Sequence, residues 1–225
     1  MSIFYKISLY LNLLKYYIRY NYTKVDDKYL LFLKEYFKGK ADGFYIDVGA
    51  YHPFRLSNTK FLYEKGWSGI NIDISKKSID LFKIVRKRDV NLNIGIGEKD
   101  ETSEAYFKKD TFHANTLDFK HAEKFLGNSR KKKIEVLTLS SVINKYVKNK
   151  RIDFIDIDCE GKDLEVIRGL KFNDSEIDLI SIEMHGYDDI TKKRGDLIFG
   201  IMRDNGFKKI FGDYPDTLIF QRNKH

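Results

Sequence analysis

Residues 44–53 read Phe44-Tyr45-Ile46-Asp47-Val48-Gly49-Ala50-Tyr51-His52-Pro53 and carry the main signal for the fold. An apolar run ends in an acid and a glycine, as in a buried parallel strand that leads into a tight loop. Open α/β sheets bind ligands at the loops that follow the carboxyl ends of their strands. The next apolar run, residues 69–73, also ends in an acid, Asp73. An acid about this far beyond a glycine turn commonly binds the hydroxyl groups of a ribose.

The composition indicates one globular α/β domain with an excess of positive charge. The chain has 225 residues, of which 42% are hydrophobic, so it can bury a substantial core and is not disordered. The net charge of +8 favours an acidic partner, although the lysine richness that an AT-rich genome produces explains it equally well. The single cysteine, Cys159, excludes an intrachain disulfide and fits a reducing compartment. We therefore expect a cytoplasmic protein.

The sequence predicts a helical N-terminal extension, residues 1–40, before the α/β domain, residues 41–225. Residues 3–22 combine helical spacing with many aromatic side chains and with basic residues, and no acid precedes Asp26. One interpretation is a helix that makes peripheral contact with an anionic membrane. The interpretation that we favour is a helix packed on the sheet or on a second subunit of a homodimer. No apolar stretch is long enough to span a bilayer.

Strand and helix patterns alternate from residue 44 to the end of the chain. This alternation predicts a mostly parallel sheet with helices on both faces, and a final hairpin predicts an antiparallel strand at one edge. Residues 98–107 are predicted to form a short polar hairpin, and the basic segment that follows, to Lys133, is predicted to be irregular. The apolar runs predict strands near residues 44–48, 69–73, 90–96, 134–137, 152–158, 178–184, 207–211 and 217–222.

Acids and histidines gather at the ends of two later strands. Strand alternation buries Asp156, which therefore needs a hydrogen-bonding partner. Parallel strands end at the same edge of a sheet, so we expect one rim of titratable side chains: Asp158, Glu160, Glu183 and His185. Such a rim can perform acid–base chemistry or bind a divalent metal, Mg²⁺ or Mn²⁺. The metal ligands would be Asp158, Glu183 and His185.

Several nucleotide-binding motifs are absent from the sequence. It contains no GxxxxGK[ST], no GxGxxG and no Gly-x-Ser-x-Gly. An acid on the first strand, a single glycine and an acid on the second strand suit a nucleoside without a pyrophosphate. S-adenosylmethionine is such a ligand.

These residues resemble the FkbM-type S-adenosylmethionine-dependent methyltransferases. The resemblance covers roughly residues 44–185 and rests on five segments: 44–53, 57–59, 63–73, 91–97 and 155–161. It implies a class I methyltransferase fold, which is a Rossmann-like, doubly wound, seven-stranded sheet with an antiparallel last strand. Tyr51-His52-Pro53 stands where methyltransferases commonly have another glycine, so this loop departs from the fuller motif.

The resemblance also implies which residues bind the cofactor. Asp47, Gly49 and Ala50 would line the methionine part, together with Tyr51 of the same loop. Asp73 would bind the ribose, and Asn93 would lie near the adenine.

We expect the protein to methylate a hydroxyl oxygen of a sugar. The resemblance implies this acceptor class, and the lysines of residues 108–133 suit the diphosphate of a nucleotide-linked sugar in polysaccharide or related glycan biosynthesis. We predict that His185 is the general base, because its ordinary pKa suits neutral pH. Asp158 and Glu183 would orient it, bind acceptor hydroxyl groups or hold the metal. His52 and Glu160 would contact the acceptor.

Two other functions stay open. A non-catalytic nucleoside-binding module would not need so many titratable groups at one rim. A nucleic-acid methyltransferase would normally show a motif such as Asn-Pro-Pro-Tyr after the fourth core strand, where this chain has Asp158-Cys159-Glu160-Gly161. We therefore expect a small-molecule partner and not nucleic acid.

Overall fold

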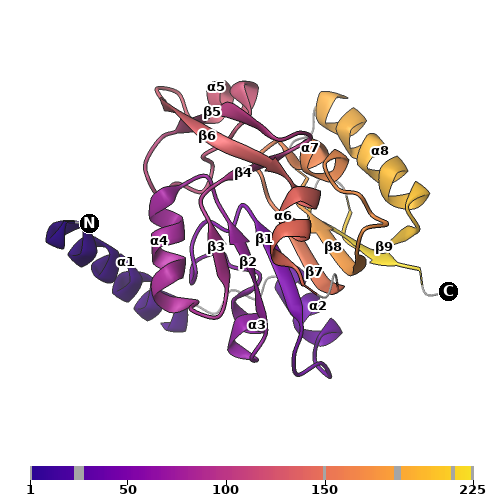
Figure 1. The fold of residues 1–225 in the computed structure, drawn as a ribbon, viewed down its shortest axis with the longest axis horizontal. Coiled ribbons are helices and arrows are strands. Elements are labelled where there is room, and N and C mark those ends of the chain that lie inside the picture. Colours follow the sequence, from indigo (N-terminus) through magenta and orange to yellow (C-terminus); the bar gives the residue numbers. More distant parts are fainter. Residues whose placement is uncertain (1, 23–27, 149–150, 185–188, 214–215, 224–225) are drawn as a thin grey trace.

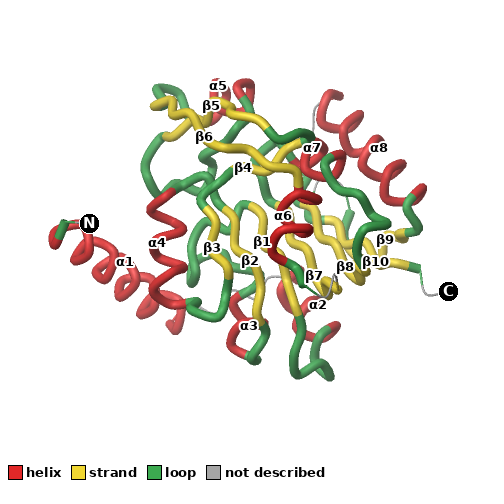
Figure 2. The backbone as a smooth tube through the Cα atoms, in the orientation of Figure 1, coloured by secondary structure: helices red, strands yellow, loops and turns green. Residues whose placement is uncertain are grey.

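The computed structural model describes residues 2–22, 28–148, 151–184, 189–213 and 216–223. A seven-stranded sheet forms the centre of the molecule, with helices on both of its faces (Figures 1 and 2). Its strands lie in the order β3-β2-β1-β7-β8-β10-β9. Their bounds are β1 (Phe44–Val48), β2 (Ser68–Ile72), β3 (Val90–Leu92), β7 (Arg151–Ile157), β8 (Glu176–Ile182), β9 (Phe207–Phe211) and β10 (Leu218–Arg222).

The pairing directions confirm most of the predicted topology. The pairs β1–β2, β2–β3, β1–β7 and β7–β8 are parallel, whereas β10 is antiparallel to both β8 and β9. The last strand is therefore antiparallel, as the resemblance implies. The prediction that it lies at an edge is wrong, because β10 inserts between β8 and β9.

Two apolar layers hold the helices against the sheet. Ile46, Val48 and Ile155 point to the face covered by α6 (Leu139–Tyr146), α7 (Asp163–Arg168) and α8 (Asp189–Asp204). The opposite face, with Tyr45 and Phe154, packs against α2 (Lys28–Tyr36) and α3 (Lys60–Glu64). The two faces separate because successive strand residues point to opposite sides. Outside these layers, α1 (Ile3–Tyr22) packs on α4 (Lys76–Val85). The domain boundary at residue 40 stays a prediction.

A second, three-stranded sheet lies above the carboxyl ends of the central strands (Figure 1). It consists of β4 (Gly95–Gly97), β6 (Arg130–Thr138) and β5 (Glu101–Phe107), with α5 (Phe119–Phe125) in the connection between β5 and β6. The single strand predicted near residues 90–96 is therefore divided between two sheets. The predicted hairpin at 98–107 and the irregular segment to Lys133 are also wrong. Residues 130–133 are exposed and basic, so no hydrophobic alternation reveals a strand that backbone pairing with β5 forms.

A row of polar side chains crosses the face of the central sheet that α2 and α3 cover. Asn71, Asp47, Asp156 and Ser181 occupy neighbouring positions on β2, β1, β7 and β8, and we call them the polar row. All four are buried. The hydroxyl of Tyr29, on α2, lies 2.8 Å from Asp156 Oδ1, to which it donates a hydrogen bond, and 2.7 Å from Ser181 Oγ. This contact fixes α2 to the middle of the sheet.

We expect Tyr29→Phe to lower the free energy of unfolding by about 1–3 kcal/mol, because it removes a buried donor from a carboxylate. Urea denaturation followed by circular dichroism measures the change. Tyr10→Phe is the matched control, since Tyr10 is 60% exposed, and it should stay within about 0.5 kcal/mol of the wild type. Equal urea midpoints for wild type and Tyr29→Phe would contradict the assignment.

Candidate functional site

A cleft opens at the carboxyl ends of β1, β2 and β7, with the loop before α5 over it. We call it the central cleft; its cavity volume is about 40 Å³. The strand ends contribute Gly49, Asp73 and Asp158, and apolar side chains complete the wall. The covering loop contributes five residues: Phe112, His113, Asn115, Thr116 and Leu117. The parallel strands thus deliver their terminal residues to one place, as expected for an open α/β sheet.

The loop after β1 has the tight geometry that its glycine predicts. Gly49 has a positive φ of 87°, and a Cβ there would lie only 1.7 Å from the carbonyl oxygen of Asp158. The backbone N–H groups of Gly49 and Ala50 donate to the carbonyl of Ile72, at 2.9 and 3.0 Å. Any larger residue at position 49 would push β1 away from the loop after β7.

Asp73 lies at the end of β2 and joins two loops. Its carboxylate accepts hydrogen bonds from the backbone N–H of Tyr51 at 2.8 Å and from that of Ser75 at 2.6 Å. Burial raises its pKa to about 6, although these two bonds favour the ionised form. A carboxylate has about four lone-pair directions, so two remain for a ligand's hydroxyl groups. Asp73 therefore combines a fixed orientation with spare accepting capacity.

Asn93, the residue after β3, supports the same loop. Its side-chain amide donates to the carbonyl oxygens of Asp73 at 3.0 Å and Ile74 at 2.9 Å. Ile74 lines the central cleft. Asn93 thus acts on the cleft through the backbone of residues 73–74, and its predicted contact with adenine stays a prediction.

Asp47 and Ala50 lie behind the central cleft and are not among its lining residues. Asp47 is buried in the polar row, and its carboxylate accepts a hydrogen bond from the hydroxyl of Thr59 at 2.6 Å. Burial and the neighbouring Asp156 carboxylate raise the pKa of Asp47 to about 7, against the opposing effects of Arg86 and Thr59. The predicted cofactor contact of these two residues stays a prediction.

His52 faces helix α1. Its Nδ1 accepts from the backbone N–H groups of Phe54 and Arg55, both at 3.1 Å, so its Nε2 carries the proton and donates to Asn12 Oδ1 at 2.9 Å. Burial and two nearby arginines lower the pKa of His52 to about 3, which keeps the ring neutral. In this structure His52 fixes α1 to the loop after β1. Its predicted contact with the acceptor stays a prediction.

Two of the predicted rim acids lie at the ends of neighbouring strands. Asp158 N–H donates to the carbonyl of Val48 at 3.0 Å, and Glu183 N–H donates to that of Ile157 at 2.9 Å. Both side chains are half-buried, and Asp158 lines the central cleft. His185 lies outside the described residues. Among the residues that the structure does describe, no group of three or more His, Cys, Asp or Glu side chains could hold a metal ion.

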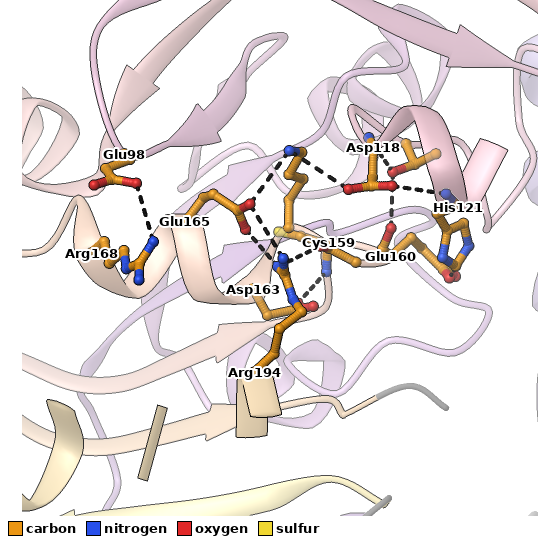
Figure 3. A network of polar contacts seen from close by, with 12 residues as sticks. Glu98, Asp118, His121, Cys159, Glu160, Asp163, Glu165, Arg168 and Arg194 are labelled. Atoms are coloured by element: carbon orange, nitrogen blue, oxygen red, sulfur yellow. Dashed lines mark hydrogen bonds and ion pairs between the residues drawn. The ribbon is translucent and has the colours of Figure 1, made fainter. Parts of the chain in front are cut away.

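Glu160 contacts two histidines of the segment between β5 and β6, residues 108–129, which we call the insertion. The sequence patterns did not single out these histidines. The carboxylate of Glu160 lies 3.1 Å from His121 Nε2 and 3.7 Å from His113 Nδ1, and its backbone carbonyl accepts from Thr116 Oγ1 at 2.9 Å. Figure 3 shows Glu160 and His121 side by side. No sequence signal could have found these contacts, because some 40 residues separate the partners and no shared motif links them.

A second set of ionic contacts surrounds the loop between β7 and α7 (Figure 3). Lys162 lies between Asp118 of the insertion, at 3.6 Å, and Glu165 of α7, at 3.5 Å. Arg194 of α8 contacts Glu165 at 2.6 Å and donates to the carbonyl of Gly161 at 2.7 Å. The loop after β7 is therefore held on both sides.

Comparison with known proteins places these features in a family. The sequence profile described as the methyltransferase FkbM domain matches residues 47–209. A comparison with curated proteins gives no match.

Two solved structures match most of this chain at low sequence identity. A putative rRNA methylase from Clostridium thermocellum is 10% identical, with a TM-score of 0.48, over 89% of this chain and 100% of that one. A TehB-like SAM-dependent methyltransferase from Corynebacterium glutamicum is 12% identical, with a TM-score of 0.46, over 94% of this chain and 97% of that one.

The raised pKa of Asp47 predicts that stability depends on pH. The pKa of Asp47 is higher in the folded chain than in the unfolded chain, so folding favours the protonated carboxyl group. The contribution of Asp47 to the free energy of unfolding is therefore complete below about pH 4 and is lost as the pH rises through about 7. Urea unfolding at pH 6.5, 7, 7.5 and 8 should show a falling free energy of unfolding, whereas below about pH 6.5 the lowered pKa of His52 has the opposite effect on stability.

Asp47→Asn should flatten this pH profile, whereas the exposed control Asp213→Asn should leave it unchanged. A profile that stays steep in Asp47→Asn would assign the proton to another group, with Asp156 the first to test because burial also raises its pKa.

Proposed function

The chain belongs to the methyltransferase family with an FkbM domain, and we propose that it methylates a hydroxyl oxygen of a sugar with S-adenosylmethionine as the methyl donor. The observation that carries the proposal is a pair of acids, Asp158 and Glu183, at neighbouring strand ends beside a cleft that presents Asp73. Acids in such a place accept hydrogen bonds from sugar hydroxyl groups, and they favour proton removal at neutral pH.

The residues of the central cleft fit the chemistry of this cofactor. Asp73 has accepting capacity for ribose hydroxyl groups, and the turn at Gly49 brings backbone close to the ligand. Ile74, Ile94 and Leu117 supply apolar surface for the adenine ring. Ligand pockets usually measure roughly 300–1,000 Å³, which exceeds the cleft volume of about 40 Å³. We propose that the covering loop, residues 112–117, is displaced when the cofactor enters.

The bound cofactor supplies a methyl group on a sulfonium that is already activated for transfer. The protein then has to align the acceptor oxygen and receive its proton. We propose that His185, which follows Glu183 and Met184 in the sequence, accepts the proton of the acceptor hydroxyl. Asp158 and Glu183 orient the acceptor by accepting its other hydroxyl hydrogens. If a divalent metal takes part, its proposed ligands are the same three residues, and the metal would lower the pKa of the acceptor hydroxyl.

A sugar linked to a nucleotide is the proposed acceptor, in polysaccharide or related glycan biosynthesis. The segment of residues 108–133 carries the basic residues Lys108, Lys109, Lys120 and Lys124. Part of this segment, residues 112–117, covers the central cleft, and the lysines on either side of that part suit the diphosphate of such an acceptor.

We expect Asp73→Asn to weaken S-adenosylmethionine binding by about 10- to 100-fold, since hydrogen bonds to charged groups contribute roughly 1.5–3 kcal/mol. Isothermal titration calorimetry measures the affinity, and the exposed Asp204→Asn is the control. Circular dichroism checks folding, because Asp73 also accepts two backbone hydrogen bonds. Unchanged affinity in a folded Asp73→Asn protein would refute the ribose assignment.

His185→Ala, Glu183→Gln and Asp158→Asn should each lower kcat by roughly 10²- to 10⁴-fold with little change in cofactor affinity. Transfer of a radiolabelled methyl group to a panel of nucleotide sugars, with RNA as a further acceptor, gives the rate and the substrate class. Full activity of His185→Ala would remove it from the mechanism. Loss of activity with EDTA, restored by Mg²⁺ or Mn²⁺, would establish the metal; activity unaffected by EDTA would leave the acid–base route alone.

A further inference from the structure

Helix α1 has an inner face that is fixed against the rest of the protein. Leu9 and Leu13 are buried against Leu81 of α4. The hydroxyl of Tyr5 donates to Asp80 of α4 at 2.9 Å, and Asn12 accepts from His52. Contacts along the helix therefore determine which of its faces points away from the protein.

The outward face of α1 is apolar. Phe4, Ile7, Leu11, Leu14 and Ile18 follow one another at intervals of three and four residues, so they form one stripe, which we call the outer stripe. Their exposed fractions are 81%, 49%, 62%, 55% and 49%. A soluble protein rarely leaves so continuous an apolar surface without a partner.

The charges around the outer stripe are positive. The sequence holds no acid before Asp26, whereas Lys6, Lys15 and Arg19 lie on the helix itself. Tyr10 and Tyr17, 60% and 53% exposed, flank the stripe with rings that are apolar along their length and polar at the tip. Apolar side chains bordered by cations and tyrosines are typical of a helix that lies in a membrane interface.

A basic groove begins at the first turn of α1 and adds an independent observation. Its volume is about 760 Å³, and its walls include Ser2 and Tyr5 of the N-terminal region. Four lysines also line it: Lys76, Lys77, Lys132 and Lys133. One acid, Asp110, lies in the wall and is paired with Arg130 at 2.8 Å. Such a groove is suited to the phosphate of a lipid headgroup.

We propose that α1 lies flat on an anionic phospholipid bilayer, with the outer stripe in the apolar layer and the surrounding cations on the headgroups. No helix among the described residues is long and apolar enough to cross a membrane, which agrees with a helix that lies on the surface.

A second copy of the chain suits the outer stripe less well than lipid does. The stripe spans only two heptads, and coiled coils need at least three or four, with opposite charges along their flanks. Here the charged residues of α1 are all cations, so a second copy would face like charge with like charge.

Vesicle flotation with the full chain tests the proposal. We expect the protein to float with phosphatidylcholine vesicles that contain about a quarter phosphatidylglycerol, and to do so at least tenfold less with phosphatidylcholine alone. Leu11→Glu/Leu14→Glu should reduce flotation at least tenfold. The matched control is Leu197→Glu on α8, where the leucine is 48% exposed and remote in sequence from α1. Lys6→Glu/Lys15→Glu changes only exposed charges and should also reduce flotation about tenfold.

Three results would overturn the proposal. The first is wild-type protein that stays unbound to the anionic vesicles, and the second is undiminished flotation of the Leu11→Glu/Leu14→Glu variant. The third is a wild-type dimer without vesicles that this variant converts to a monomer in analytical ultracentrifugation, because the outer stripe would then join two copies. Methyl transfer to a soluble acceptor is a separate measurement, so failure here leaves the proposed function standing.

Discussion

The buried guanidinium of Arg86 holds together the segments from which the central cleft is built. It donates to Ser57 and Thr59 of the loop after β1, at 2.6 and 2.7 Å, and to Asn71 of β2 at 3.1 Å. It also donates to the carbonyl of Pro53 at 3.1 Å. A buried charge is tolerated only with such a full set of partners, and removing any one of them leaves a guanidinium N–H of Arg86 without an acceptor. The path of the loop from Gly49 to Thr59 therefore depends on a residue at the end of α4.

Local patterns predicted the parts of the fold that short segments determine. The strands from β1 to β10 on the central sheet follow from apolar runs, and the need of Asp156 for partners is met by Tyr29, Asn58 and Ser181. The sequence did not predict that Arg86 is buried, because Arg86-Lys87-Arg88 has the composition of a solvent-exposed basic cluster. The packing of α4 buries Arg86. The second sheet escaped notice because exposed lysines cover the outer part of β6.

The candidate site was predictable to a similar depth. Gly49, Asp73 and Asp158 line the central cleft, since strand ends and a single glycine determine their places. Asp47 and Ala50 do not line the cleft. The alternation of side chains along a strand does not show which of its last residues will face a ligand. The two histidines on Glu160 come from an insertion whose path over the sheet depends on long-range packing. Such long-range contacts produce no periodic pattern of residues in the sequence.

The hydrogen bond between His52 and Asn12 has a thermodynamic consequence. The same short loop holds Tyr51, whose N–H orients Asp73, and His52, which secures α1. Any ligand that orders this loop from one side lowers the entropic cost of ordering it from the other. If α1 engages a membrane as proposed, occupation of the cleft and that engagement would be linked reciprocally, by equal factors in the two binding constants.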